Sequence, residues 1–332
     1  MNKKQLQWLF YEKRYNFRDY WLNRIISRHL TVPLWGFEPH IYLYGGKFLH
    51  GAKWANKRIS DLIRSDEPFM VARFGNTELN VMNAYKRIEL FGDNQFSDEL
   101  NAEWWEKLNV LSGFFPNDIA YEGKFSNLLY ESMLDVDLLG VWTRRMEDYY
   151  LRTEMKQADI TALRWMEPWY SDEPWTWALE GKKVLVIHPF EKSIRSQYEK
   201  RKELFPENEL LPEFELDVIK AVQTVGDAVD DRFETWFDAL DYMYNEAISR
   251  DFDVAIIGCG AYGMPLASML KKAGKKAIHL GGVTQCLFGI KGSRWIDNPR
   301  DKKMPINEAW VYPDDEETPK GSTKVENNCY WK

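Results

Sequence analysis

The sequence predicts an α/β fold in which a mainly parallel sheet is flanked by helices. Apolar runs at 68–74, 183–188, 253–257 and 276–280 have the length of buried strands, and helical patterns alternate with them. After the third run, residues 258–263 match the spacing Gly-x-Gly-x-x-Gly, which suits a tight turn from strand to helix. A chain of 332 residues can form one large domain of this kind with additions. We therefore expect a Rossmann-like fold.

The N-terminal part, residues 1–55, is expected to be a helical extension. Phe17, Trp21 and Ile25 recur at helical spacing within residues 1–30. Residues 1–30 hold seven basic and two acidic side chains, a local charge of +5. A basic, aromatic helix of this kind can lie on an anionic membrane surface. The alternative, which we favour, is a helix packed on its own domain with its basic face in solvent.

Residues 56–332 are expected to form the main domain. In its first half, and in the segment that leads into it, we expect a loop at 31–55, a helix at 54–65, a strand at 68–74, a break at 75–77, a helix from 78 to 85 and a mostly helical insertion near 98–180. In its second half we expect a strand at 183–188 ended by Pro189, a helix to about 204, an amphipathic helix at 231–250, a strand at 253–257, a helix at 264–273 and a strand at 276–280. The last forty residues are rich in loops and end in aromatic residues, which indicates a strap that returns over the domain.

The composition narrows the class of protein. A net charge of −7 makes a nucleic-acid partner unexpected. The three cysteines include no Cys-x-x-Cys pair, which argues against a zinc cage and suits a reducing compartment. The sequence has neither the pattern of a secretory signal nor an apolar segment long enough to span a bilayer. We therefore expect a cytoplasmic protein, at most peripheral at the inner face of a membrane. The 15 tryptophans are expected mainly in the core, although aromatic rings also stack on sugars.

The glycine turn contains Gly258, Gly260, Tyr262 and Gly263. Glycines allow a ligand to approach the backbone closely, and the N-terminus of the following helix offers N–H groups to an anion. Binding of NAD would also need an acidic residue at the end of the next strand. That strand ends in His-Leu-Gly-Gly at 279–282, so no NAD is expected. A turn without a ligand and a site for another phosphate-bearing ligand remain as interpretations.

The segment 281–295 follows this turn and combines flexible backbone with polar side chains. It contains Gly281, Gly282, Gln285, Lys291 and Arg294. Glycine-rich backbone beside two cations is typical of a site for a phosphorylated ligand. Alternatively, the two cations are simply solvated.

A second turn follows the first strand and contains Arg73, Gly75, Asn76 and Glu78. Arg73 can pair with a phosphate. One interpretation of the rest is structural: Asn76 or Thr77 caps the next helix, and Glu78 stabilises its first turn. The functional interpretation is that Glu78 binds a divalent cation or acts as a general base.

His188 ends the strand at 183–188, at the edge of the sheet where ligands bind. It is a candidate general base or phosphate contact, and a purely structural role is an equal alternative. His279 has the same ambiguity. Ser193, Arg195 and Gln197 follow His188 into a helix start, where they either meet an anion or form a cap and a solvated face.

Residues 72–79 resemble the turn strand–Arg-Phe-Gly-Asp-x-Glu of GT-D-type glycosyltransferases. In that family the Asp-x-Glu pair holds the metal that binds the diphosphate of a nucleotide sugar. The resemblance implies manganese or magnesium at Glu78 and Asn76. Asn76 replaces the family's carboxylate with a neutral oxygen, which lowers the expected metal affinity.

The C-terminal half is similar to uncharacterised proteins encoded near bacterial surface-polysaccharide genes. The similarity rests on His188-Pro-Phe with Ser193, on 197–201, on Leu-Pro-Glu-Phe at 211–214, on 260–266, on 281–295 and on Glu-Asn-Asn-Cys-Tyr-Trp at 326–331. Together with the turn, it covers residues 60–331, and 258–295 is its most specific part.

We therefore expect a glycosyltransferase that uses a nucleotide-activated sugar in surface polysaccharide or glycoconjugate biosynthesis. Arg73, Lys291 and Arg294 would neutralise the diphosphate, and Glu78 would be the acidic centre. The implied partners are a nucleotide-sugar donor and a glycan or lipid-linked glycan acceptor. A non-catalytic nucleotide- or sugar-binding protein of the same pathway is the alternative, favoured by Asn76. A NAD(P)-dependent oxidoreductase is the third, disfavoured by the missing acid.

Overall fold

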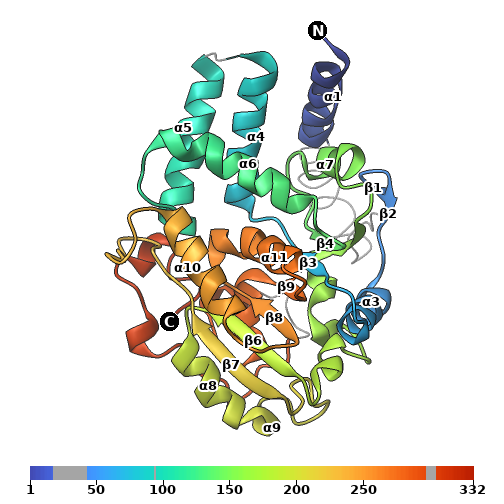
Figure 1. Cartoon of the computed structure of the whole chain (residues 1–332), viewed down its shortest axis with the longest axis vertical. Helices are drawn as coiled ribbons and strands as arrows, with labels where there is room; N and C mark the ends of the chain where they lie inside the picture. Colours follow the sequence, from blue (N-terminus) through green and yellow to red (C-terminus); the bar gives the residue numbers. More distant parts are fainter. Residues whose placement is uncertain (18–42, 93–94, 297–303) are drawn as a thin grey trace, which may run out of the picture.

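The computed structural model describes residues 1–17, 43–92, 95–296 and 304–332. Its centre is a sheet of seven strands in the order β5-β4-β3-β9-β8-β6-β7, with every neighbouring pair parallel (Figure 1). The strands are β3 (Met70–Ala72), β4 (Leu138–Val141), β5 (Asp159–Ala162), β6 (Lys183–His188), β7 (Glu215–Lys220), β8 (Val254–Ile257) and β9 (Ala277–His279). This arrangement confirms the predicted α/β, Rossmann-like class.

The central strands are buried on both sides, as parallel sheets require. Along β3, Met70 and Ala72 belong to one hydrophobic cluster, and Val71 belongs to the other. Strands β6 and β8 divide their side chains between the same two clusters in the same alternating way. Each face of the sheet therefore has its own core, because successive side chains of a strand point to opposite faces.

The helices of the main domain divide between these two cores. The first core takes side chains from α4 (Asn76–Phe91), α5 (Gln95–Ser112), α6 (Glu122–Met133), α7 (Glu147–Thr153), α10 (Trp236–Ile248) and α11 (Gly263–Lys272). The second core takes them from α3 (Ala52–Arg64), α8 (Glu191–Glu199), α9 (Arg201–Leu204), α12 (Thr284–Leu287), α13 (Ser293–Ile296) and the C-terminal residues. Helix α10 starts at a capping box in which Thr235 and Asp238 exchange hydrogen bonds.

The strands predicted at 68–74, 183–188, 253–257 and 276–280 are all present. Three other strands of the seven-stranded sheet were not predicted. The segment 98–180, expected to be mostly helical, contains β4 and β5 in addition to helices, because strands of four residues are too short to show a period. Strand β7 was missed because it is an edge strand with the polar pattern Glu-Leu-Asp-Val-Ile-Lys. The helix expected from 231 begins later, at Trp236.

The N-terminal helix α1 (Lys3–Phe17) packs against α4 and α7. Trp8 is buried and makes edge contacts with Tyr149 and Tyr150. Helix α1 is therefore docked on the domain, as favoured from the sequence. The predicted positions 21 and 25 lie outside the described residues. Part of the expected loop forms a two-strand hairpin of β1 (Leu43–Tyr44) and β2 (Lys47–Phe48). Across the described ranges, the helices are all too short or too polar to cross a membrane.

Candidate functional site

The carboxyl ends of β3, β9, β8 and β6 open into one cavity of about 470 Å³. These four strands are neighbours in the sheet. Strands β8 and β6 are neighbours, but the chain leaves them in opposite directions. From β8 it continues to β9, which lies on the side away from β6, and from β6 it continues to β7, which lies on the side away from β8. Such a divergence at the carboxyl edge of a parallel sheet is where ligands bind in open α/β folds. The volume lies in the range of small-molecule sites.

Most of the residues singled out from the sequence line this cavity, although they come from distant segments. The lining includes Arg73, Gly75, Asn76, Glu78, His188, Gly258, Gly260, Tyr262, Gly281, Gly282, Gln285 and Arg294. Gly263 and Lys291 are absent from the lining. The turn after β3 and the turn after β8 are therefore two walls of a single site.

Arg73 presents a positive charge to the cavity. Its Nε is buried and has no hydrogen-bond partner among the described residues. Its guanidinium lies 4.4 Å from the ring centroid of Trp142, and Trp142 is fixed by donating its indole N–H to the Phe74 carbonyl at 3.1 Å. Desolvation on burial lowers the pKa of Arg73, and the charge of Glu78 partly opposes this. A partly buried arginine that remains charged and lacks a partner for its buried Nε is suited to binding an anion.

The N-terminus of α4 lies at the same wall. Gly75 is the N-cap residue and provides no side-chain cap. The expected capping by Asn76 or Thr77 is therefore wrong; Asn76 instead accepts a hydrogen bond from Asn80 through its carbonyl oxygen at 2.7 Å. The uncapped first turn of this 16-residue helix lines the cavity at Asn76, Thr77 and Glu78. Its backbone N–H groups add to the positive potential beside Arg73.

Glu78 lies next to Arg73, in the first turn of α4. Its carboxylate folds back over Gly75, in the space that a Cβ at position 75 would occupy. Glu78 is buried, yet it borders the cavity. The basic Arg73 and the acidic Glu78 thus lie in one short segment, and the missing side chain of Gly75 leaves space for the Glu78 carboxylate.

The glycine turn forms the opposite wall. Gly260 has φ +59°, a conformation that glycine adopts without strain. A Cβ at Gly258 would lie 2.7 Å from both His188 and Thr284, so this glycine lets two neighbouring segments approach. A Cβ at Gly263 would overlap the ring of His279. Gly263 therefore allows the start of α11 to pack directly against the His279 ring, and it does not line the cavity.

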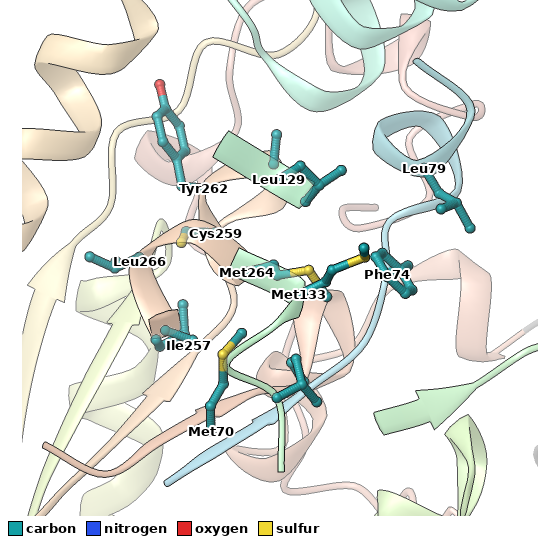
Figure 2. Close-up of a cluster of buried hydrophobic side chains, with 14 of the residues drawn as sticks. Met70, Phe74, Leu79, Leu129, Met133, Ile257, Cys259, Tyr262, Met264 and Leu266 are labelled. Carbon is teal, nitrogen blue, oxygen red and sulfur yellow. The ribbon is translucent and has the colours of Figure 1, made fainter. Parts of the chain in front are cut away.

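The glycine turn is continuous with a buried apolar cluster. Figure 2 shows Cys259 and Met264 gathered with Met70, Ile257 and Phe74 in one buried cluster. Burial raises the pKa of the Cys259 thiol well above its usual range, which leaves it unsuited to act as a nucleophile. The ring of Tyr262 stacks on Trp236 with centroids 4.5 Å apart and planes inclined by 6°, which ties the turn to α10.

His188 has a defined tautomer. Its Nδ1 accepts a hydrogen bond from the Phe190 backbone N–H at 3.0 Å, and burial lowers the pKa of the imidazole to about 3. The ring is therefore neutral, and its proton resides on Nε2. An Nε2 that already carries a proton is a hydrogen-bond donor and not a base. Of the two roles predicted for His188, the geometry favours contact with a phosphate or hydroxyl oxygen.

The C-terminal strap, defined as residues 304–332, completes the cavity. Tyr330 and Trp331 line it, and Tyr330 accepts a hydrogen bond from Arg294 at 2.7 Å. A Cβ at Gly282 would overlap the Tyr330 ring, so the strap can pack closely here only because residue 282 is a glycine. Arg294 also pairs with Glu326. Its charge is therefore partly satisfied within the protein, in contrast to that of Arg73.

Gln285 lines the cavity and also joins two segments of the chain, whereas Lys291 is not among the lining residues. Gln285 donates to the carbonyls of Ile290, Lys291 and Tyr330 at 2.9–3.3 Å, which joins its loop to the strap. Lys291 is held by backbone hydrogen bonding to Val311, and its ammonium lies 5.9 Å from the Tyr312 ring centroid. The expectation that Lys291 faces the site is wrong, because its backbone pairs with Val311 of the strap and it is not among the lining residues.

Ser193, Gln197 and Arg195 are likewise structural. Ser193 donates to Glu317, Gln197 donates to the carbonyls of Gly289 and Ala309, and Arg195 pairs with Glu191 and Asp217. Several lining residues were not predicted: Trp104 and Lys107 on α5, Trp142 after β4, and Glu167. For the two tryptophans the sequence offers only a high tryptophan content, which points to no single position. Tyr330 and Trp331 belong to the strap that was predicted to return over the domain.

A divalent cation would have few protein ligands here. Within the described part of the chain, no three His, Cys, Asp or Glu side chains cluster closely enough to hold a metal ion. Glu78 and Asn76 supply one carboxylate and one amide at the cavity wall. A magnesium or manganese ion on these two residues would take its remaining ligands from a diphosphate and water, as Mg²⁺ commonly does.

Comparison with known proteins gives no match: no family model, no curated protein and no solved structure is similar to this chain.

Proposed function

We propose that the protein is a glycosyltransferase that uses a nucleotide-activated sugar, in the biosynthesis of surface polysaccharide or glycoconjugate. The observation that carries the proposal is the unpartnered Nε of Arg73 beside the uncapped N-terminus of α4, in one cavity. A cation and helix N–H groups at one wall are the complement of a diphosphate. The resemblance of residues 72–79 to the GT-D-type turn supports the same ligand class.

The remaining lining suits the other parts of such a donor. Trp104 and Tyr330 line the cavity with aromatic rings on which a sugar or a base can stack. Arg294, held by Tyr330, adds a second positive charge. His188 offers an N–H donor from β6. Together these groups bind a ligand that is anionic at one end and flat at the other.

In the proposed reaction the bond between the anomeric carbon and the diphosphate oxygen breaks, and the diphosphate leaves with both electrons. Arg73 and the α4 N–H groups stabilise this negative charge as it develops. A hydroxyl of a glycan or lipid-linked glycan acceptor forms the new bond to the anomeric carbon and gives its proton to Glu78. If Glu78 instead held a manganese or magnesium ion together with Asn76, the ion would supply further charge neutralisation and the proton would pass to solvent.

A second candidate is a non-catalytic protein that binds a nucleotide or sugar in the same pathway. Asn76 favours it, because an amide replaces a carboxylate in the resembling turn. An NAD(P)-dependent oxidoreductase is less well supported, since β9 leads into Leu280 and Gly281 without an acidic residue.

The test is thermal stabilisation by nucleoside diphosphates, nucleotide sugars and NAD(P), with and without manganese or magnesium. A ligand at a hundred times its Kd should stabilise the fold by about 2.7 kcal/mol. Arg73→Ala should abolish this effect. Arg58→Ala is the matched control, because Arg58 pairs with Asp159 away from the cavity. Stabilisation only by NAD(P) would overturn the proposal.

Turnover separates the two candidate functions. Release of nucleoside diphosphate from a nucleotide sugar supports the transferase, and Glu78→Gln should then lower the rate strongly. Tight binding without hydrolysis or transfer to any acceptor would favour the non-catalytic protein. An unchanged rate for Glu78→Gln would remove this residue from the mechanism.

A further inference from the structure

Helix α1 buries one face and leaves an apolar stripe on the other. Leu6, Phe10 and Phe17 have exposed fractions of 57%, 61% and 62%. At 3.6 residues per turn these three positions fall within an arc of about 40° around the helix axis. Isolated exposed apolar side chains are common on protein surfaces, but an aligned set on one helix face indicates a surface that binds something.

Basic side chains border this stripe on both sides. On the same helical projection Lys13 lies about 20° to one side of the stripe, and Lys3 and Arg14 lie within about 40° on the other. All three are exposed. The helix residues carry four basic side chains and one acidic side chain, a charge of +3 within a chain of net charge −7. The exposed face is therefore cationic on a protein that is acidic as a whole.

The only acidic side chain of the helix points away from this face. Glu12 is turned inward, where it pairs with Arg145 and, at 3.5 Å, with Arg87. Arg14 approaches the buried carboxylate of Asp148 only at 3.9 Å, and its own side chain remains 43% exposed. No negative charge on α1 itself thus interrupts the cationic border.

The stripe is held in a fixed orientation. On the inner side of α1, Trp8 packs against Tyr149 with ring centroids 5.1 Å apart. Gln5 donates to the Leu90 carbonyl near the end of α4 at 2.6 Å. The helix lies at one end of the molecule, beside α4 and α7 (Figure 1). Because these contacts anchor the helix, binding at the stripe would not require its release from the domain.

We propose that this face of α1 binds an anionic phospholipid surface, with Leu6, Phe10 and Phe17 entering the headgroup region and Lys3, Lys13 and Arg14 pairing with phosphates. An apolar face with basic borders is the pattern by which amphipathic helices lie in a membrane interface. The charge complementarity selects an anionic bilayer over a second copy of this acidic chain. The proposal stands on α1 alone and is independent of the cavity's function.

The test uses the full chain and cosedimentation with vesicles of phosphatidylcholine alone or mixed with phosphatidylglycerol. Binding is expected only to the phosphatidylglycerol vesicles, and raising the salt concentration should weaken it. The triple variant Leu6→Ser/Phe10→Ser/Phe17→Ser should lose binding. Each basic charge removed should lower the affinity about fivefold, so that Lys3→Gln/Lys13→Gln binds about twenty-five times more weakly.

Matched controls use exposed residues elsewhere. Ile119→Ser/Val229→Ser removes exposed apolar side chains far from α1 in sequence, and Lys200→Gln/Lys202→Gln removes two exposed charges; both should bind as the unchanged protein does. Unaltered melting temperatures show that the variants fold.

Absence of binding to phosphatidylglycerol vesicles, or equal binding by the triple variant, would overturn the proposal. A dimer in solution that the triple variant converts to monomer, with no vesicle binding, would instead identify a second copy as the occupant.

Discussion

The carboxylate of Glu78 occupies the space beside the Gly75 backbone that a β-carbon would take. The Glu78 carboxylate can therefore take this position only because residue 75 is a glycine. Glu78 has a flexible end that can move, so a small substituent at position 75 should displace the acid without unfolding the protein.

We expect Gly75→Ala to reduce turnover, or ligand binding if the protein is non-catalytic, while the melting temperature changes little. The backbone at Gly75 has φ −73°, which alanine adopts readily. Gly51→Ala is the control, because Gly51 is also a helix N-cap and has open space around its Cα. Equal activity of Gly75→Ala and the unchanged protein would show that the position of Glu78 does not matter.

Gly263→Ala should act differently and destabilise the fold. The new β-carbon would overlap the ring of His279, which is buried and has little freedom to move. Forcing an extra carbon into a packed core costs about 1–3 kcal/mol. Urea unfolding measures the loss, again with Gly51→Ala as the control. A stability equal to that of the control would mean that His279 rearranges at little cost.

Stability should fall in mild acid because of two buried histidines. Burial lowers the pKa of both His188 and His279 to about 3, whereas an unfolded histidine titrates near 6.5. Between these values the unfolded chain binds more protons, so stability is full above about pH 6.5 and declines as the pH falls toward 3. At pH 5 the loss is about 2 kcal/mol for each histidine.

Urea unfolding at pH 7.5 and pH 5 checks this effect. His188→Gln and His279→Gln should each show a smaller difference between the two pH values than the unchanged protein. His50→Gln is the control, since His50 is only half-buried and stacks on Trp54 at the surface. If removing either buried histidine left the pH difference unchanged, that imidazole would not be a source of the acid sensitivity.

The C-terminal strap should detach when Glu317 is removed. This buried carboxylate accepts hydrogen bonds from the Lys192 N–H at 2.7 Å and the Ser193 N–H at 3.3 Å, and from the Ser193 hydroxyl. It thereby caps α8, and the indole of Trp331 donates to its backbone carbonyl at 3.2 Å. Removing the Glu317 carboxylate leaves the N–H groups of Lys192 and Ser193 without their acceptor, which costs about 1–3 kcal/mol.

Limited proteolysis is the measurement. Glu317→Ala should be cleaved in the strap faster than the unchanged protein, and it should bind cavity ligands more weakly because Tyr330 and Trp331 are walls of the site. Glu316→Ala is the neighbouring control, with a side chain 81% exposed. Identical cleavage of the two variants would contradict a role for Glu317 in holding the strap.

Much of the sheet could be predicted because β3, β6, β8 and β9 are apolar runs bounded by turns. The convergence of two distant turns also followed from topology, since the carboxyl ends of parallel strands share an edge. The strand β4 escaped prediction because its four residues include Gly140 and lie within a tryptophan-rich segment. Trp142, which contacts Arg73, was missed together with it.

Side-chain direction in irregular segments could not be predicted. Gln285 and Lys291 lie in the same glycine-rich loop as Arg294, and composition gave all three one role. Their actual directions depend on the strap, because the amide of Gln285 donates to the Tyr330 carbonyl, 45 positions along the chain. Such a contact has no local signature, so only the assembled structure shows that Gln285 and Arg294 line the cavity and that Lys291 does not.

The place of β3 in the sheet has a consequence for how the chain is made. Strand β3 pairs on one side with β4, from the first half of the chain, but on the other side the register partner of Met70 is Ala277. A nascent chain that has emerged only to residue 276 therefore carries a fully apolar strand with one bare edge. Open apolar strand edges invite pairing between molecules. Ribosome-bound intermediates and truncated products of this protein should depend on chaperones until its final strand is synthesised.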